Sequence, residues 1–128
     1  MTPEAGEHID KARGYLLKAR NLLDVMQYND EAGRAAYLAG FHAAQALISE
    51  RTGKTAHTHE GVHSQFNMLT RGDLRFDPEL RGFLSRAYDL KAIADYETGP
   101  EAEIPVGRAE EAIVLATRFV EVVVRLLE

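Results

Sequence analysis

The sequence predicts an all-α protein, an antiparallel up-and-down helical bundle of four long helices and one short helix. Three observations carry this prediction. Apolar residues recur at spacings of three and four along each long segment, two segments begin with a capping residue followed by proline, and no segment alternates with a period of two. With 128 residues, of which 45 % are hydrophobic and 27 % charged, the chain fits one folded domain covering residues 1–128.

The first two long segments have clear starts and apolar faces. Thr2-Pro3 predicts a helix start, and the stripe that follows consists of Ile9, Ala12, Leu16, Ala19, Leu23 and Met26. The pattern breaks at residues 28–30, where Asp30 is placed to cap a second helix. One face of that helix consists of Ala36, Ala39, Ala43 and Ala46. Such small residues permit close approach of a neighbouring helix, and Gly53 is placed to end this one.

The remaining segments predict a short helix and two long ones. The short helix is expected over about residues 60–70, closed by Gly72, with apolar positions Val62, Phe66 and Leu69. Asp77-Pro78 predicts the start of a fourth helix, which stops by Gly99-Pro100. The last helix runs to about residue 127 and is rich in valine. Helix is still predicted there because its apolar positions repeat at three and four.

Composition excludes several kinds of protein. The chain has no cysteine, which rules out disulfides, cysteine nucleophiles and thiolate metal sites and suits a cytoplasmic location. No apolar signal core and no stretch long enough to cross a bilayer is present, so no membrane association is expected. A formal net charge of −5 argues against broad electrostatic binding to nucleic acid. Arginines over residues 71–91 are interspersed with acidic residues, which favours a solvated mixed face.

The segment from Arg34 to Phe66 joins the small-residue helix to a turn with three histidines, and Ala94-Asp95-Tyr96 follows downstream. This combination resembles the HEPN superfamily over roughly residues 7 to 127. The matching positions are Arg34, Ala36, Tyr37, Ala39, Phe41, Ala43 and Ala44, then Thr58-His59-Glu60-Gly61-Val62 and Phe66, then Ala94-Asp95-Tyr96. Leu38 replaces the second tyrosine of the family's pattern, and Lys91 replaces an arginine. The resemblance implies a single small helical bundle.

The histidine turn also matches a metal-binding pattern. His59 to His63 reads H-E-x-x-H, and His57 would bring a third imidazole into the same short span. Gly61 weakens a helix by about 1 kcal/mol relative to alanine, and no histidine follows His63. These three histidines are therefore weak metal candidates. A structural role is favoured, in which His59 caps the short helix or anchors the loop, and no cofactor is expected.

Ribonucleases of the family are similar to one another in a second motif, an arginine followed after four to six residues by a histidine. In metal-independent cleavage the histidine moves the 2'-hydroxyl proton, and the arginine stabilises phosphate charge. Arg51 and His57 fit this spacing, but the family's motif belongs to a later part of the bundle, where this chain has no histidine. The catalytic candidates are therefore His57, His59 and His63, with Arg51 or Arg34 as the partner.

Asp95 is the second feature of interest. Near the end of the fourth helix, its carboxylate is placed to form a salt bridge with an arginine such as Arg34 and so tie two helices together. Lys91 lacks the bidentate fork of the arginine that it replaces. The candidate cleft for a ligand or a partner consists of Arg34, Tyr37, His59, Lys91, Asp95 and Tyr96.

The resemblance implies three functions, in this order. The first is a protein–protein interaction module in a toxin–antitoxin-like pair with a minimal nucleotidyltransferase. The second is a metal-independent endoribonuclease that uses the turn with Arg51, His57 and His59, for which RNA would be the substrate. The third is a bundle that binds a nucleotide or another small ligand. We also expect a homodimer, because the alanine stripe and the valine-rich last helix offer more apolar surface than a small bundle needs.

Overall fold

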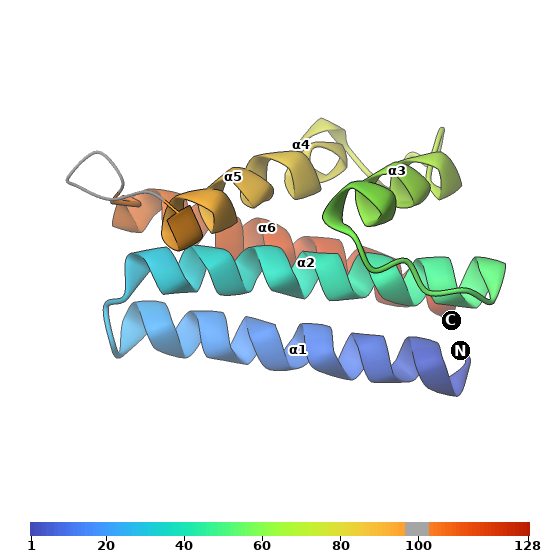
Figure 1. Cartoon of the computed structure of the whole chain (residues 1–128), viewed down its shortest axis with the longest axis horizontal. Helices are drawn as coiled ribbons and strands as arrows, with labels where there is room; N and C mark the ends of the chain where they lie inside the picture. Colours follow the sequence, from blue (N-terminus) through green and yellow to red (C-terminus); the bar gives the residue numbers. More distant parts are fainter. Residues whose placement is uncertain (97–102) are drawn as a thin grey trace.

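The computed structural model describes residues 1–96 and 103–128, and all regular elements in these ranges are helices. They are α1 (Pro3–Asp24), α2 (Asn29–Thr52), α3 (His59–Leu69), α4 (Pro78–Arg81), α5 (Phe83–Tyr96) and α6 (Val106–Leu127). Figure 1 shows α1 and α2 side by side, with α6 behind α2 and with α3 and α5 along its other side. The predicted all-α bundle is confirmed. The predicted stop at Gly99-Pro100 lies outside the described residues.

Three predicted helix ends are present. The backbone N–H of Ala5 donates to the Thr2 hydroxyl at 3.2 Å, and the N–H of Leu80 donates to the Asp77 carboxylate at 2.9 Å. Each side chain thereby satisfies a backbone donor that the first turn leaves free. Gly53 ends α2 in the left-handed conformation, with φ 72°, which glycine adopts without steric cost.

Two predicted ends differ in the structure. α2 begins at Asn29, so Asp30 lies inside the first turn and does not cap it. Its carboxylate instead accepts the backbone N–H of Ile104 at 2.9 Å, from a segment 74 residues away. The predicted fourth helix is also broken, because Gly82 separates a single turn, α4, from α5. Glycine is a poor helix former, and at this break the Arg86 guanidinium donates a hydrogen bond of 2.6 Å to the Glu79 carbonyl.

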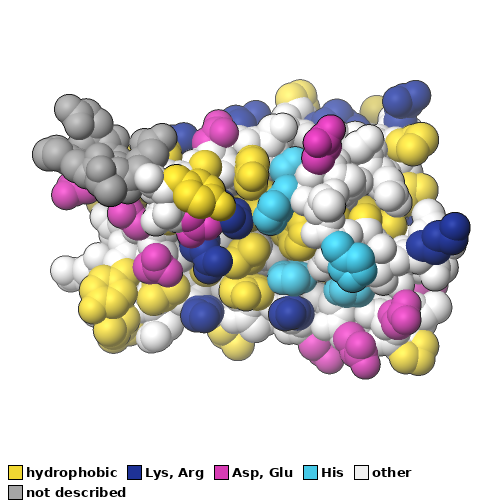
Figure 2. All heavy atoms as spheres, in the orientation of Figure 1, with side chains coloured by type: hydrophobic (Ala, Val, Ile, Leu, Met, Phe, Trp, Pro, Cys, Tyr) yellow, Lys and Arg dark blue, Asp and Glu magenta, His cyan; other side chains and the backbone are white. Residues whose placement is uncertain are grey.

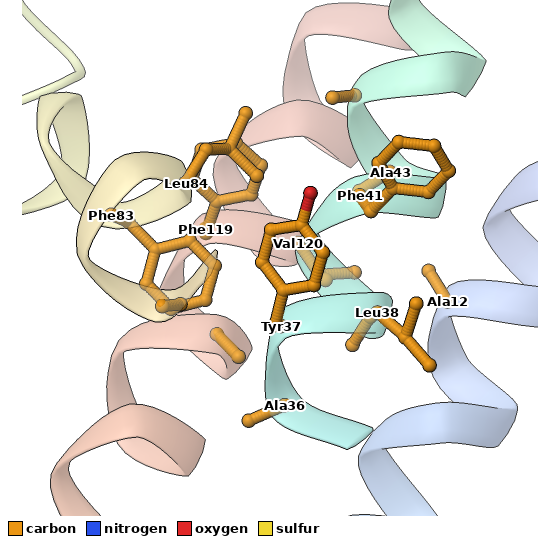
Figure 3. Close-up of a cluster of buried hydrophobic side chains, with 14 of the residues drawn as sticks. Ala12, Ala36, Tyr37, Leu38, Phe41, Ala43, Phe83, Leu84, Phe119 and Val120 are labelled. Atoms are coloured by element: carbon orange, nitrogen blue, oxygen red, sulfur yellow. The ribbon is translucent and has the colours of Figure 1, made fainter. Parts of the chain in front are cut away.

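The core is built around α2. Its alanine stripe is fully buried, as expected for a close helix contact: Ala36, Ala39, Ala43 and Ala46. Figure 3 shows Tyr37 on this helix among side chains from α5 and α6, including Phe83 and Phe119. Leu69 is the exception among the predicted apolar positions of the short helix, since it is 39 % exposed beyond the last buried turn of α3.

Gly40 sets the distance between α2 and α5. A Cβ atom built on Gly40 would lie 2.4 Å from Cε2 of Phe83, far inside van der Waals contact. Phe83 is the first residue of α5 and is 2 % exposed, so its ring has little room to turn away. The missing side chain at position 40 therefore allows α5 to lie close against α2, and α5 carries much of the site described below.

The apolar surfaces from which a homodimer was expected are covered within the chain. The alanine stripe is buried, and in the valine-rich part of α6 Val120, Val122 and Val123 are buried as well. These surfaces therefore give no reason for a second copy to bind, and the homodimer stays a prediction. In the described ranges, no helix combines the length and the apolar character that crossing a bilayer requires.

Candidate functional site

The start of α3 places two histidines against α2. Thr58 caps this helix, because its hydroxyl accepts the backbone N–H of Gly61 at 3.0 Å. The cap is therefore Thr58 and not His59, which begins the helix itself. His59 and His63 are four residues apart, so they lie on one side of α3, one turn from each other. This side faces Tyr37 of α2.

The Tyr37 hydroxyl joins the two imidazoles. Its oxygen lies 2.8 Å from Nδ1 of His59 and 2.8 Å from Nε2 of His63. A hydroxyl has one hydrogen to donate and accepts through its lone pairs. With both rings neutral, Tyr37 therefore donates to one ring and accepts an N–H from the other. Tyr37 has no exposed surface, so these two bonds are what satisfies its buried polar atom.

Aromatic rings enclose this pair of histidines. The His59 ring lies 4.8 Å from that of Phe41 and 5.1 Å from that of Tyr88, between ring centroids. The His63 ring meets Tyr88 edge-on, with 5.8 Å between centroids. Sequence reasoning did not assign Tyr88 to the site. The signal was present, because Tyr88 precedes Lys91 by three residues and Asp95 by seven, which puts all three on one face of α5.

Burial keeps the two imidazoles neutral. It lowers the pKa of His59, an effect that Lys91 reinforces and Asp95 opposes. Burial also lowers the pKa of His63, and His59 adds to that shift. Burial raises the pKa of the Tyr37 phenol above its ordinary value, with a further contribution from Tyr88. At neutral pH the arrangement is therefore two uncharged imidazoles linked through a protonated phenol.

Two cations share one carboxylate beside the histidines. Nζ of Lys91 lies 2.6 Å from Oδ2 of Asp95, and Nε of Arg34 lies 2.8 Å from Oδ1. The ion pair between Arg34 and Asp95 that the sequence indicated is present and joins α2 to α5. The hydrogen bond from Lys91 lowers the pKa of Asp95 most, and Arg34 lowers it further. Lys91 is 8 % exposed and Tyr96 is 74 % exposed, so the cluster runs from the interior to the surface.

Arg51 and His57 lie apart from this cluster. The Arg51 guanidinium donates to the carbonyl of Leu126 near the end of α6, at 3.2 Å. His57 is exposed in the segment before the Thr58 cap. Within residues 1–96 and 103–128, no hydrogen bond or ring contact connects either of them to Tyr37, His59 or His63. Of the sequence-derived catalytic candidates, the structure thus brings His59 and His63 together, and Arg34 belongs to the same cluster through its ion pair with Asp95.

The H-E-x-x-H match has a different geometry from a metal site. His59 and His63 both bind the Tyr37 hydroxyl, and Glu60 is exposed. In the part of the chain that the structure describes, no three His, Asp or Glu side chains are placed to hold a metal ion. The spacing in the sequence places two histidines on one side of α3, where both rings bind the buried Tyr37 hydroxyl.

Figure 2 shows histidines in a band across the face on which α3 lies over α2, with Lys and Arg side chains beside them. The arginines of residues 71–91 form a different, mixed surface. Arg75 pairs with Asp73 at 2.8 Å, and Arg81 donates to the Thr70 carbonyl at 3.0 Å and the Asp73 carbonyl at 3.1 Å. Arg75 and Arg81 thus both donate to groups of the same chain, in keeping with the mixed face predicted from the sequence.

A comparison with protein-family models matches the HEPN domain over residues 5–127, nearly the whole chain. The chain belongs to the HEPN domain family. The fold brings together three of the positions on which the resemblance to this family rests: Tyr37 on α2, His59 on α3 and Asp95 on α5. No curated protein matches this HEPN chain in sequence.

Proposed function

We propose that this HEPN-domain chain is a protein–protein interaction module and that its partner is a minimal nucleotidyltransferase, the two forming a toxin–antitoxin-like pair. The observation that carries the proposal is the state of the motif side chains. Tyr37, His59 and His63 bind one another, and Asp95 holds both Arg34 and Lys91. Polar groups that already satisfy one another form a rigid network and need no substrate to complete them.

The exposed end of the cluster supports a protein as the partner. Tyr96 is 74 % exposed, and the Lys91 ammonium lies 5.6 Å from the centre of its ring. Tyrosine is enriched at interfaces because it has a large apolar body and a polar tip. A partner that covers Tyr96 would also come close to Arg34 and Asp95, which supply charge for orientation.

The test is to identify the product of the neighbouring gene, which the proposal expects to be a minimal nucleotidyltransferase. Its binding to this chain is then measured by calorimetry on the two purified proteins. We expect a complex that Tyr96→Ala weakens at least tenfold, the effect of an interface residue worth about 1.4 kcal/mol. Leu17→Ala is the matched control, because Leu17 on α1 is 76 % exposed and lies on another helix. A nucleotidyltransferase that does not bind, a neighbouring gene of another class, or equal loss in both variants would contradict the proposal.

A second candidate function is metal-independent RNA cleavage, which one observation favours. His59 is neutral and lies in the same cluster as Arg34 and Lys91, so a general base stands near two cations that could stabilise phosphate charge. This combination replaces the Arg51–His57 pair that the sequence suggested. The interaction module ranks first because Asp95 occupies both cations and Tyr37 binds both imidazoles.

Cleavage of single-stranded RNA in EDTA separates the two functions. We expect no robust cleavage by the wild-type protein. The comparison includes His59→Ala and His63→Ala, with His57→Ala as the control for an exposed histidine of the same turn. Metal-independent cleavage that leaves 2',3'-cyclic phosphate ends, and that only the first two variants lose, would establish the nuclease. Cleavage that survives in all variants would indicate a contaminant, whereas nucleotide binding without cleavage would favour the small-ligand alternative.

A further inference from the structure

The hydrogen bonds of the Tyr37 hydroxyl can be kept when one of the two imidazoles, His59 or His63, is protonated, but not when both are. When one ring is protonated, it donates an N–H to the Tyr37 oxygen, and the hydroxyl donates to the ring that stays neutral. When both rings are protonated, both nitrogens carry hydrogens, and the hydroxyl hydrogen has no acceptor. Because Tyr37 is fully buried, that hydrogen cannot turn to water instead. The geometry therefore tolerates the first proton and opposes the second.

The charges around the pair also oppose a second proton. From α5, Lys91 disfavours a proton on His59, Asp95 favours one, and Tyr88 contacts both rings without charge. From α2, Tyr37 is neutral, and Arg34 acts through its ion pair with Asp95. The surroundings thus contain two cations and one carboxylate, and two imidazolium rings would add like charge on the same side of α3. Glu60, the acidic residue beside His59 on α3, is exposed.

The two ends of α3 are attached in different ways. Its first turns meet α2 through His59 and His63, and Val62 between them is buried. Its last turn is fixed by Phe66, whose ring lies 5.1 Å from that of Phe119 on α6 and 5.4 Å from that of Phe76, between centroids. The aromatic end carries no titratable group in these contacts, so a change of pH acts on the histidine end alone.

We propose that Tyr37, His59 and His63 form a pH-sensitive latch, which holds the first turns of α3 against α2 and releases them when both imidazoles are protonated. Released, these turns would uncover the Tyr37 hydroxyl and the Phe41 ring, while Phe66 would keep the end of the helix in the core. The device changes the accessible face of the bundle without unfolding it.

The direction of the pH dependence follows from linkage. Burial lowers the pKa of both histidines in the closed state below their ordinary value of 6.5. The open state, whose rings face water, therefore binds more protons as the pH falls below about 6.5. The closed state keeps its full stability above that pH and loses it as the pH falls toward the lowered pKa values. The latch is thus closed at neutral pH and opens under mild acid.

Hydrogen exchange of the full chain between pH 7 and pH 5, corrected for the pH dependence of intrinsic exchange, tests the latch. We expect peptides covering residues 59–69 to lose protection on acidification, by up to about tenfold per pH unit for each proton that the opening takes up. Peptides from α1 and α6 should stay protected. Unchanged protection of α3 at pH 5, or equal loss in all helices, would overturn the proposal.

Two variants remove one titrating ring each and keep its hydrogen bond. The amide of His59→Asn replaces Nδ1, and that of His63→Gln replaces Nε2. With one histidine left, the hydroxyl always has an acceptor and the opening takes up at most one proton, so the response of α3 should shrink to at most about tenfold per pH unit, below that of the wild type. His42→Gln, which changes another half-buried histidine, should respond like the wild type. A full response in either latch variant, or rapid α3 exchange in both already at pH 7, would overturn the latch.

Discussion

The histidines of the turn between α2 and α3 belong to two regions with different chemistry. His59 and His63 are inside α3, contact the fully buried Tyr37 and have lowered pKa values. His57 lies one residue before the Thr58 cap and is exposed. In the sequence the three residues look alike. The difference shows that the spacing of residues determines which helix face they share only where a helix has begun. His59 and His63 follow the Thr58 cap and share a face, whereas His57 precedes it.

The largest effect is expected from the residue on which the buried pair depends. Tyr37→Ala should lower the free energy of unfolding by about 3–5 kcal/mol, as truncation of a buried aromatic ring does, since it leaves a cavity and removes the partner of both histidines. Urea denaturation at pH 7 measures the loss. Tyr28→Ala, at a tyrosine that is 55 % exposed, is the control and should change stability by less than about 0.5 kcal/mol. Similar losses of unfolding free energy for Tyr37→Ala and Tyr28→Ala would contradict the special role of the buried tyrosine.

A smaller effect is expected from the carboxylate beside the pair. Asp95→Asn should cost about 1–3 kcal/mol at pH 7, because the nearly buried Lys91 then lacks its anionic partner. The pKa of Asp95 is lowered, so its contribution is present above the ordinary carboxyl pKa of 3.8 and is lost as the pH falls through the lowered value. Denaturation curves of wild type and variant should therefore converge in acid. Asp24→Asn, at an exposed ion pair with Arg20, should change little at any pH.

A substitution of Arg51 tests the region that precedes the Thr58 cap, outside α3. Arg51→Ala removes a hydrogen bond to the Leu126 carbonyl at the C-terminal end of α6, where a cation is favourable. The expected cost is about 0.5–1 kcal/mol by thermal or chemical denaturation. The hydrogen exchange of α3 should not change. Faster exchange at residues 59–69 in this variant would mean that Arg51 supports the histidine pair after all.

The smallest effect is expected at His57. His57→Ala should change the free energy of unfolding by less than about 0.5 kcal/mol, the usual range at an exposed position. His63→Ala should cost more, because it leaves the buried Tyr37 hydroxyl with one of its two partners. Measured side by side at pH 7, the two substitutions give the contrast directly. Equal costs would show that the turn acts as one unit.

Sequence reasoning predicted those features that depend on local order. The helices, the caps Thr2 and Asp77, the end at Gly53 and the contact between Arg34 and Asp95 follow from spacing and side-chain chemistry. It missed features that depend on which segments meet in space. Asp30 was predicted as a cap, yet its carboxylate accepts the backbone N–H of Ile104. No local sequence pattern indicates a hydrogen-bond partner so far along the chain.

The same limit explains what was missed in the site. Tyr37 and His59 were both assigned to the candidate cleft, but their hydrogen bond requires the docking of α3 on α2, which sequence spacing does not specify. Arg51 and His57 fit the spacing of the ribonuclease motif, but α2 ends and the chain turns between them. Their side chains therefore do not point to a common site. Tyr88 could have been found from its position on the face of α5 that also presents Lys91 and Asp95.

The contact between Gly40 and Phe83 has a consequence for the evolution of this family. Any side chain at position 40 meets the Phe83 ring, and moving that ring would shift α5 and draw Tyr88 away from the histidines. Positions 40 and 83 should therefore vary together among related chains, with a larger residue at 40 only where a smaller one stands at 83. The same coupling should make Phe83→Leu less harmful in a Gly40→Ala background than in the wild type.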